Sequence, residues 1–231
     1  MPYRAVLFDF FGTLTQAISR GPAHAHIARW LGCDPRAFTS ALDRTFLERA
    51  RGGYGTAQQS LRRVAEEAGA LPGRTRVAVA LPVRVAAVRA DTRLRAEAVP
   101  VLRGLRERGL RTGLISDCTH ELPRYLPAMP IAPLLETCVY SIEVGACKPD
   151  PRMYLTACER LAVEPAECLY IGDGGSQELS GARAVGMTAV RLAARDLGRH
   201  LRFNGEQGWT GHTARTLREA VTYLEGEPAV R

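Results

Sequence analysis

Four short segments of the chain carry residue types that could perform acid, anion or metal chemistry. They are DFFGTLT (residues 9–15), LISD (114–117), ACKPDP (146–151) and YIGDGGSQELSGA (170–182). Their carboxylates are ionised at neutral pH and can act as nucleophiles or bind divalent cations. Their hydroxyl and ammonium groups can hold an anion. Such chemistry requires that the fold bring the four segments together.

The first segment predicts a buried strand that ends in a carboxylate. The apolar run AVLF at residues 5–8 is typical of a strand inside a parallel sheet, and Asp9 follows it directly. In open α/β folds, ligands bind at the carboxyl ends of such strands. Gly12 lets the backbone turn sharply and approach a bound group. Taken alone, this segment also fits a strand that ends in a solvated turn acid.

The third segment contains the one lysine of the chain. Of the 31 basic side chains, Lys148 is a lysine and the other 30 are arginines. A composition that otherwise uses arginine suggests that Lys148 lies where a compact ammonium is needed and a guanidinium fork does not fit. The alternative is an ordinary surface lysine.

The fourth segment predicts a cation site. Asp173 and Glu178 lie five residues apart after an apolar run, and Gly174 and Gly175 would let the loop curl so that both acids reach one point. Mg²⁺ takes one or two carboxylates from a protein and keeps several waters. For Glu178 the alternative is an acid that stabilises a helix N-terminus.

In order and spacing, these segments resemble the four motifs of the haloacid dehalogenase-like (HAD) hydrolase superfamily, from Asp9 to about Gly186. The resemblance implies an α/β fold with a Rossmann-like parallel-sheet core and an inserted all-helical cap. It also implies Mg²⁺-dependent hydrolysis of a small phosphorylated metabolite through an aspartyl-phosphate at Asp9.

The resemblance further implies a role for each motif residue. The expected catalytic residues are Asp9, Lys148 and Ser116. The expected phosphate-binding residues are Ser116, Asp117, Lys148, Gly12 and Thr13. Mg²⁺ is the expected cofactor, and its expected ligands are Asp9, the backbone carbonyl of Phe11, Asp173 and Glu178.

The chain departs from the commonest superfamily pattern at Phe11. Most HAD phosphatases carry there a second aspartate, which protonates the leaving group and later activates water. HAD dehalogenases carry a tyrosine at this position and bind no metal. Phe11 therefore favours a metal-independent 2-haloacid dehalogenase, whereas Asp173 and Glu178 favour a phosphatase. We favour the phosphatase, because an intact acid pair is harder to explain away than one missing acid.

Other groups could supply the missing acid, or the domain could be catalytically weak and have a binding role instead. The candidates for general acid or base are His24, His26, Asp117, His120 and Glu121. A substrate with a good leaving group, such as an acyl phosphate, would need little protonation.

The pattern of apolar residues predicts two domains. Residues 16–92 are helical in pattern and predict the cap, while residues 1–15 and 93–231 predict the core. In the cap we expect helices at 24–32, at 35–51 after the Asp34 cap, at 57–69 after Thr56, and a bent helix around Pro82. Loops at 16–20 and 52–55 are the expected hinge and substrate-facing segments. In the core, helices alternating with strands predict a parallel sheet, with helices expected at 176–186 and 213–226.

Composition and charge limit the possible partners. Hydrophobic residues make up 46% of the chain and charged residues 24%, and no apolar run approaches the ~20 residues of a membrane span. The net charge of +7 would attract an anion, but the arginines are dispersed and predict a solvated surface, not a nucleic-acid site.

Six cysteines without a C-x-x-C pair predict reduced thiols and a cytoplasmic enzyme. The expected partner is a small anionic substrate, either a phosphate ester or a haloacid. We expect neither nucleic acid nor membrane as a partner, and a monomer or a homodimer.

Overall fold

A computed structural model describes residues 3–225, and within them one six-stranded parallel sheet has the order β3-β2-β1-β4-β5-β6. The strands are β1 (Ala5–Phe8), β2 (Arg111–Ser116), β3 (Thr137–Tyr140), β4 (Cys168–Gly172), β5 (Thr188–Leu192) and β6 (Thr213–Ala214). The first strand lies in the middle of the sheet, between β2 and β4. The predicted α/β fold with a Rossmann-like parallel sheet is confirmed.

Helices cover both faces of the sheet, which explains why β1 is apolar throughout. Alternate side chains of β1 belong to two hydrophobic clusters. One cluster includes α6 (Ala98–Glu107) and α11 (Leu217–Thr222), and the other includes α9 (Pro151–Leu161) and α10 (Glu178–Ala184). All four side chains of β1 are fully buried. A strand buried on both faces requires a continuous apolar run.

Short helices and turns connect the strands. They are η1 (Phe10–Leu14), α7 (Leu122–Tyr125), η2 (Leu126–Ala128), η3 (Ala132–Leu134), α8 (Ser141–Val144), η4 (Pro165–Glu167), η5 (Gly175–Gln177), η6 (Arg195–Arg199) and η7 (Tyr223–Glu225).

Two helices of the core begin later than the sequence pattern predicts. The helix expected from residue 176 begins at Glu178, because Ser176 and Gln177 have left-handed backbone conformations with φ of 54° and 51°. The helix expected from residue 213 begins at Leu217, because residues 213–214 pair with β5 as the edge strand. Its expected last residue, 226, lies outside the described residues.

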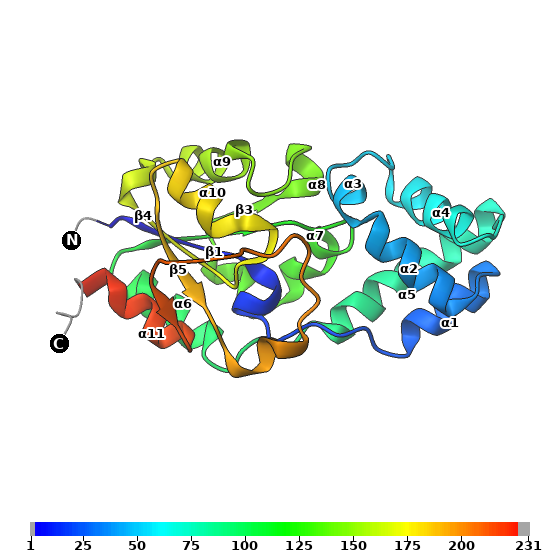
Figure 1. Ribbon diagram of the computed structural model, residues 1–231, viewed down its shortest axis with the longest axis horizontal. Coiled ribbons are helices and arrows are strands. Elements are labelled where there is room, and N and C mark those ends of the chain that lie inside the picture. The colour runs from blue at the N-terminus through cyan, green and yellow to red at the C-terminus, as the bar shows by residue number, and fades with distance from the viewer. Residues whose placement is uncertain (1–2, 226–231) are drawn as a thin grey trace.

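An all-helical insert lies between β1 and β2, as predicted. Its helices are α1 (Ala23–Leu31), α2 (Pro35–Arg44), α3 (Phe46–Ala50), α4 (Ala57–Glu67) and α5 (Arg74–Asp91), and they enclose a hydrophobic cluster of their own at one end of the molecule (Figure 1). The Asp34 side chain caps α2, and Thr56 forms a capping box with Gln59 at the start of α4.

The helix expected over residues 35–51 is split at Thr45. The Thr45 hydroxyl donates to the Ala41 carbonyl at 2.7 Å, and such local bonds compete with a regular helix. The last helix of the insert, α5, is continuous through Pro82.

The two chain segments that join insert and sheet lie side by side. Thr15 forms an antiparallel bridge with Leu94, and the Gln16 amide donates to the Arg93 carbonyl at 2.8 Å. These contacts support the proposed domain boundaries near residues 15 and 93. Within residues 3–225, no helix combines the length and the apolar character that crossing a membrane requires.

Candidate active site

The carboxyl ends of three neighbouring strands gather the predicted residues at one edge of the sheet. Asp9 follows β1, Ser116 ends β2, and Asp173 follows β4. Because β1 pairs with both other strands, these ends are adjacent. The Asp9 amide donates to the Ile171 carbonyl at 2.9 Å, which fixes the backbone of Asp9 beyond the end of its strand.

Lys148 connects the predicted segments through its ammonium group. Its Nζ donates to Asp9 Oδ1 at 2.6 Å and to Glu178 Oε2 at 2.5 Å, and it lies 3.4 Å from the Ile115 carbonyl. The side chain is buried. Burial alone would lower the pKa of Lys148, but the charges of Asp9 and then Glu178 outweigh it and hold the pKa well above its ordinary value. The side chain is therefore an ammonium.

Tyr170 on β4 belongs to the same network, and sequence analysis missed it. Its hydroxyl donates to Glu178 Oε2 at 2.7 Å and lies 3.3 Å from Lys148 Nζ. The other Glu178 oxygen accepts from the Gly174 amide at 2.9 Å. Burial and then the charge of Asp9 raise the pKa of Glu178, and Lys148 opposes them. A phenol in an otherwise aliphatic strand, CLYIG, is the signal that could have identified Tyr170.

The acid cluster of Asp9, Asp173 and Glu178 fits a divalent cation. One oxygen of each acid lies within 4.8 Å of the others. Asp173 Oδ1 accepts from the Gly175 amide at 2.9 Å, whereas Oδ2 is buried and has no hydrogen-bond partner within the described residues. Burial and then the charge of Asp9 raise the pKa of Asp173. Three buried carboxylates around one point form a set of oxygen ligands that suits Mg²⁺.

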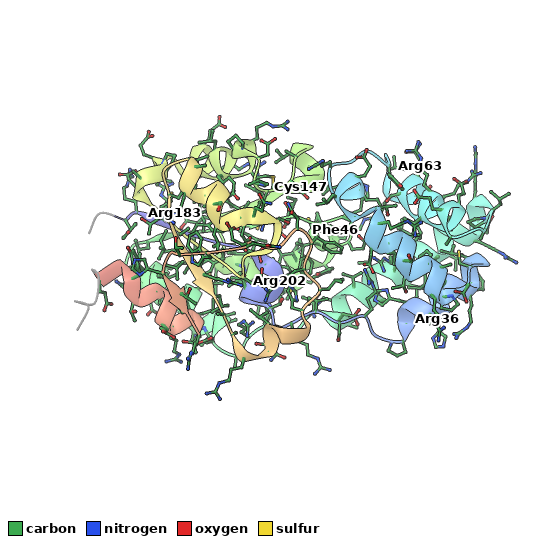
Figure 2. The ribbon with its side chains drawn as sticks, in the orientation of Figure 1. Arg36, Phe46, Arg63, Cys147, Arg183 and Arg202 are labelled. Carbon is green, nitrogen blue, oxygen red and sulfur yellow. The ribbon has the colours of Figure 1, made fainter. Side chains whose placement is uncertain are left out.

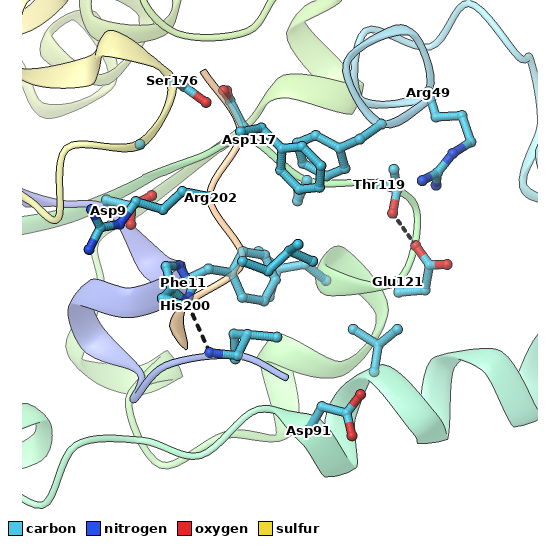
Figure 3. A pocket seen from close by; sticks show the side chains of 18 of the residues that line it. Asp9, Phe11, Arg49, Asp91, Asp117, Thr119, Glu121, Ser176, His200 and Arg202 are labelled. Atoms are coloured by element: carbon cyan, nitrogen blue, oxygen red, sulfur yellow. Dashed lines mark hydrogen bonds between the residues drawn. The ribbon is translucent and has the colours of Figure 1, made fainter. Parts of the chain in front are cut away.

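Two basic side chains from the loop between β5 and β6 face this cluster, and neither was predicted (Figure 3). Arg202 Nε lies 2.7 Å from Asp173 Oδ2, and His200 Nε2 lies 3.8 Å from the same oxygen. The carbonyl of Phe11 forms a hydrogen bond with the His200 ring, while burial lowers the pKa of His200. No motif or periodic pattern marks residues 193–212, and Arg202 is one of 30 arginines, so the sequence gives no signal for them.

The predicted phosphate-binding residues differ in the hydrogen bonds that their side chains form. Thr13 Oγ1 donates to Asp9 Oδ2 at 3.0 Å, and Asp117 Oδ1 accepts from the Lys148 amide at 3.0 Å. Gly12 has a φ of 85° and its Cα faces His200, where a Cβ would come within 2.8 Å of Nε2. Ser116, like Thr13, is fully buried and does not line the cavity, but its hydroxyl has no hydrogen-bond partner within the described residues.

The five candidates for the missing acid have different surroundings. His26 is exposed, and the ring of His120 contacts the Gly55 carbonyl at 2.9 Å away from the main cavity. His24 lines the cavity, but Arg84 and Asp91 occupy its two ring nitrogens.

The remaining two candidates differ in protonation. Burial would raise the pKa of Glu121, but Arg84, Thr119 and Arg49 lower it to about 2, so Glu121 is ionised. Burial raises the pKa of Asp117, with Lys148 opposing, and its Oδ2 has no hydrogen-bond partner within the described residues.

A cavity of about 140 Å³ separates the acid cluster from the helical insert. Its apolar lining consists of Phe11, Ile18, Phe46, Val88, Leu122, Leu201 and Phe203. The Phe46 ring, on α3 of the insert, stacks on Phe203 with ring centroids 4.1 Å apart. In Figure 2 Phe46 lies where the insert meets the sheet core.

Two arginines of the insert also line this cavity, and the sequence pattern did not single them out. Arg84 and Arg49 are buried. Arg84 Nε donates to Glu121 Oε1 at 2.9 Å. Within the described residues, Arg49 donates hydrogen bonds to two neutral oxygens, Thr45 Oγ1 at 2.9 Å and the Leu42 carbonyl at 2.8 Å. Burial lowers the pKa of Arg49 to about 10.

Comparisons with known proteins agree with this geometry. The model of the haloacid dehalogenase-like hydrolase family matches residues 3–186. The chain is 33% identical over 97 residues to glyceraldehyde 3-phosphate phosphatase of Methanopyrus kandleri, and that match covers 42% of each chain. It is 29% identical to (S)-2-haloacid dehalogenase 1 of Pseudomonas sp., over 83% of this chain and 85% of that protein.

A solved structure extends the likeness to the whole fold. The crystal structure of a HAD phosphatase from Thermococcus onnurineus matches with a TM-score of 0.63 at 23% identity, over 97% of this chain and 99% of that one. The chain spans about two fifths of the length of the curated phosphatase that it matches.

The network around Glu178 makes a prediction about stability. Above pH 8, where the raised pKa of Glu178, about 8, leaves it ionised, Tyr170→Phe removes a donor to a carboxylate, so we expect a loss of about 1.5–3 kcal/mol in the free energy of unfolding. Tyr154→Phe is the matched control, because the Tyr154 hydroxyl donates at 2.9 Å to the neutral backbone carbonyl of Glu178, and it should cost about 0.5–1.5 kcal/mol. Urea unfolding with EDTA present measures both; equal losses would contradict a charged Glu178.

Proposed function

The chain belongs to the haloacid dehalogenase-like hydrolase family, and from this premise we propose that it is a Mg²⁺-dependent phosphatase of a small phosphorylated metabolite. The acid cluster of Asp9, Asp173 and Glu178, with oxygens within 4.8 Å of one another, is the observation that carries the proposal. Without a bound cation, two further acids beside the nucleophile would repel an anionic substrate, so the cluster favours a metal-dependent enzyme.

The reaction begins at Asp9. A carboxylate oxygen of Asp9 attacks phosphorus, an O–P bond forms, and the bond to the leaving oxygen breaks. Thr13 and Lys148 hold the two Asp9 oxygens at 3.0 and 2.6 Å and so orient the nucleophile. Water then attacks the aspartyl-phosphate, which releases phosphate and restores Asp9.

Positive charge at the phosphoryl group comes from two sources. Lys148 offsets charge on the phosphoryl oxygens from the side of Asp9 and Glu178. When bound, Mg²⁺ would supply further positive charge to those oxygens. Asp9, Asp173 and the Phe11 carbonyl would hold it, with Glu178 beside them.

Asp117 is our candidate for the proton transfers that Phe11 cannot perform. It lines the cavity, its Oδ1 is fixed by the Lys148 amide, and its Oδ2 has no hydrogen-bond partner within the described residues. Burial raises its pKa, which favours the protonated form needed to donate to a leaving group. Once Asp117 has given up this proton, its carboxylate could accept a proton from the attacking water.

The helical insert acts in this proposal as a cap that selects anionic substrates. Arg49 is a buried cation that lines the cavity, and within the described residues its hydrogen bonds go to neutral oxygens. Arg49 shares the charge of Glu121 with Arg84, and a second anionic group on the substrate would give Arg49 a charged hydrogen-bond partner. The six free cysteines fit a reducing compartment, and we propose a cytoplasmic location.

A metal-independent 2-haloacid dehalogenase is the second candidate. Phe11 supports it, because displacement of halide by a carboxylate needs no leaving-group acid. The match to the Pseudomonas 2-haloacid dehalogenase also covers more of the chain than the match to the archaeal phosphatase, 83% against 42%.

A panel of phosphate esters and 2-haloacids distinguishes these candidates. We expect wild-type protein to hydrolyse at least one phosphate ester with Mg²⁺, to lose that activity in EDTA, and to lose it again in Asp9→Asn. Dehalogenation that survives EDTA would favour the second candidate. No turnover together with retained ligand binding would point to a binding role.

Replacing Asp117 and Phe11 tests the source of the proton. Asp117→Asn should lower kcat by about 10²–10⁴-fold, the usual contribution of general acid–base catalysis. Phe11→Asp should raise kcat, and in the Asp117→Asn background it should restore most of the loss. If Asp117→Asn retains full kcat, another group or the substrate supplies the proton.

Replacing Arg49 tests the anion-selective cap. Arg49→Met should raise KM by about tenfold or more, since a hydrogen bond to a charged group is worth about 1.5–3 kcal/mol, while kcat changes less. Arg44→Met is the control, because Arg44 is 56% exposed and pairs with Glu67 at 3.6 Å on the outside of the insert. An unchanged KM in Arg49→Met would remove Arg49 from the substrate site.

A further inference from the structure

A segment of the loop between β5 and β6 is anchored across the acid cluster. The Leu201 amide donates to the Ile18 carbonyl at 3.4 Å, and the Phe203 carbonyl accepts from the Ser176 amide at 2.8 Å. Further along, the Glu206 amide donates to the Gly174 carbonyl at 2.6 Å. The bonds to Gly174 and Ser176 tie this segment to the loop that carries Asp173, and the bond to Ile18 ties it to the chain after η1. The backbone of residues 201–206 is therefore held in place beside the acid cluster.

Arg202 uses this position to face Asp173. The Nε–Oδ2 distance of 2.7 Å is that of an ion pair. Neither atom has a hydrogen-bond partner within the described residues. The Arg202 side chain is 29% exposed, against 3% for Asp173. Charge therefore holds Arg202 at Asp173, while its Nη2 donates to the Leu197 carbonyl at 3.4 Å and the side chain stays partly open to solvent.

His200 covers a second predicted metal ligand. Its Nδ1 accepts from the Ile18 amide at 2.9 Å, so in the neutral ring the proton is on Nε2. That nitrogen faces the Phe11 carbonyl, which forms a hydrogen bond with the ring. Asp173 and the Phe11 carbonyl therefore both lie beside basic groups of one short segment, His200-Leu201-Arg202.

We propose that Arg202 is an internal competitor of the divalent cation, and that Mg²⁺ binds Asp173 only after the Arg202 side chain has left Oδ2. This inference rests on the metal-dependent function proposed above. Mg²⁺ demands near-octahedral oxygen ligation, and a guanidinium in contact with one ligand oxygen blocks that oxygen and repels the ion. The backbone anchors of residues 201, 203 and 206 stay in place, so the exchange is a side-chain rotation.

The competition lowers the apparent affinity for Mg²⁺ in a calculable way. Only the fraction of molecules with Arg202 turned away can bind the ion, and the apparent dissociation constant is the intrinsic one divided by that fraction. If about one molecule in ten is in that state, the loss of affinity is about tenfold. Asp173 loses the Arg202 cation and gains Mg²⁺ in its place. Its carboxylate is therefore paired with a cation both before and after the exchange.

Calorimetric titration of Mg²⁺ into EDTA-stripped full-length protein tests this competition. Arg202→Met keeps an unbranched side chain of similar length without its charge, and it should bind Mg²⁺ about tenfold more tightly than wild type. Arg195→Met is the matched control, since it removes an equal charge from an exposed position on the same loop, and it should bind as wild type does. Asp173→Asn should give no binding heat.

The increase in melting temperature on adding Mg²⁺ gives an independent readout, because at equal ligand concentration tighter binding stabilises the folded state more. That increase should be larger in Arg202→Met than in wild type at equal Mg²⁺, with circular dichroism verifying that each variant folds. Equal or weaker Mg²⁺ affinity in Arg202→Met would overturn the inference and leave the metal-dependent function standing. Binding of Mg²⁺ by neither wild type nor Arg202→Met would overturn both.

Discussion

The contact between the Lys148 ammonium and the buried acids Asp9 and Glu178 is the constraint on which the site depends. Three acids with oxygens within 4.8 Å of one another repel strongly in a buried setting. Lys148 Nζ, at 2.6 and 2.5 Å from two of them, makes their burial tolerable. Such a buried pair is weak evidence for stability, because desolvation offsets much of the attraction. Its value here is positional: one ammonium fixes an acid that follows β1 and an acid on α10 relative to each other.

The sheet topology makes that contact possible. With β1 in the middle, the ends of β2 and β4 flank Asp9, and the loop after α8 delivers Lys148 to the same edge. The glycines near the site follow from the crowding. A Cβ at Gly172 would lie 2.2 Å from Glu178 Oε1, so only glycine allows that carboxylate to turn back towards Lys148 and Tyr170. The position of Glu178 therefore depends on a residue whose own side chain is absent.

The sheet and the acid–ammonium cluster could be predicted from the sequence because short local patterns mark the strand ends, and a parallel sheet brings those ends together. An apolar run followed by an acid indicates the end of a buried strand, and parallel strands bring such ends together. Lys148 was identified because lysine is rare in this chain. Arg49, Arg84 and Arg202 were missed for the opposite reason, since nothing in a chain with 30 arginines distinguishes the few that line the cavity. The break at Thr45 depends on one side-chain hydrogen bond, and no pattern of apolar residues encodes it.

The net charge of the acid cluster bears on which substrate the site prefers. Counted in their ionised forms, Asp9, Asp173 and Glu178 carry three negative charges, against the two positive charges of Lys148 and Arg202, which leaves one negative charge. Exchange of Arg202 for Mg²⁺ at Asp173 makes the cluster neutral, because a divalent ion replaces a monovalent group. A phosphate-ester dianion gains about twice as much from this change as a haloacid monoanion, since the Coulomb energy scales with the product of the charges. The proposed exchange of Arg202 for a divalent ion would therefore favour the phosphate ester, even though position 11 holds no acid.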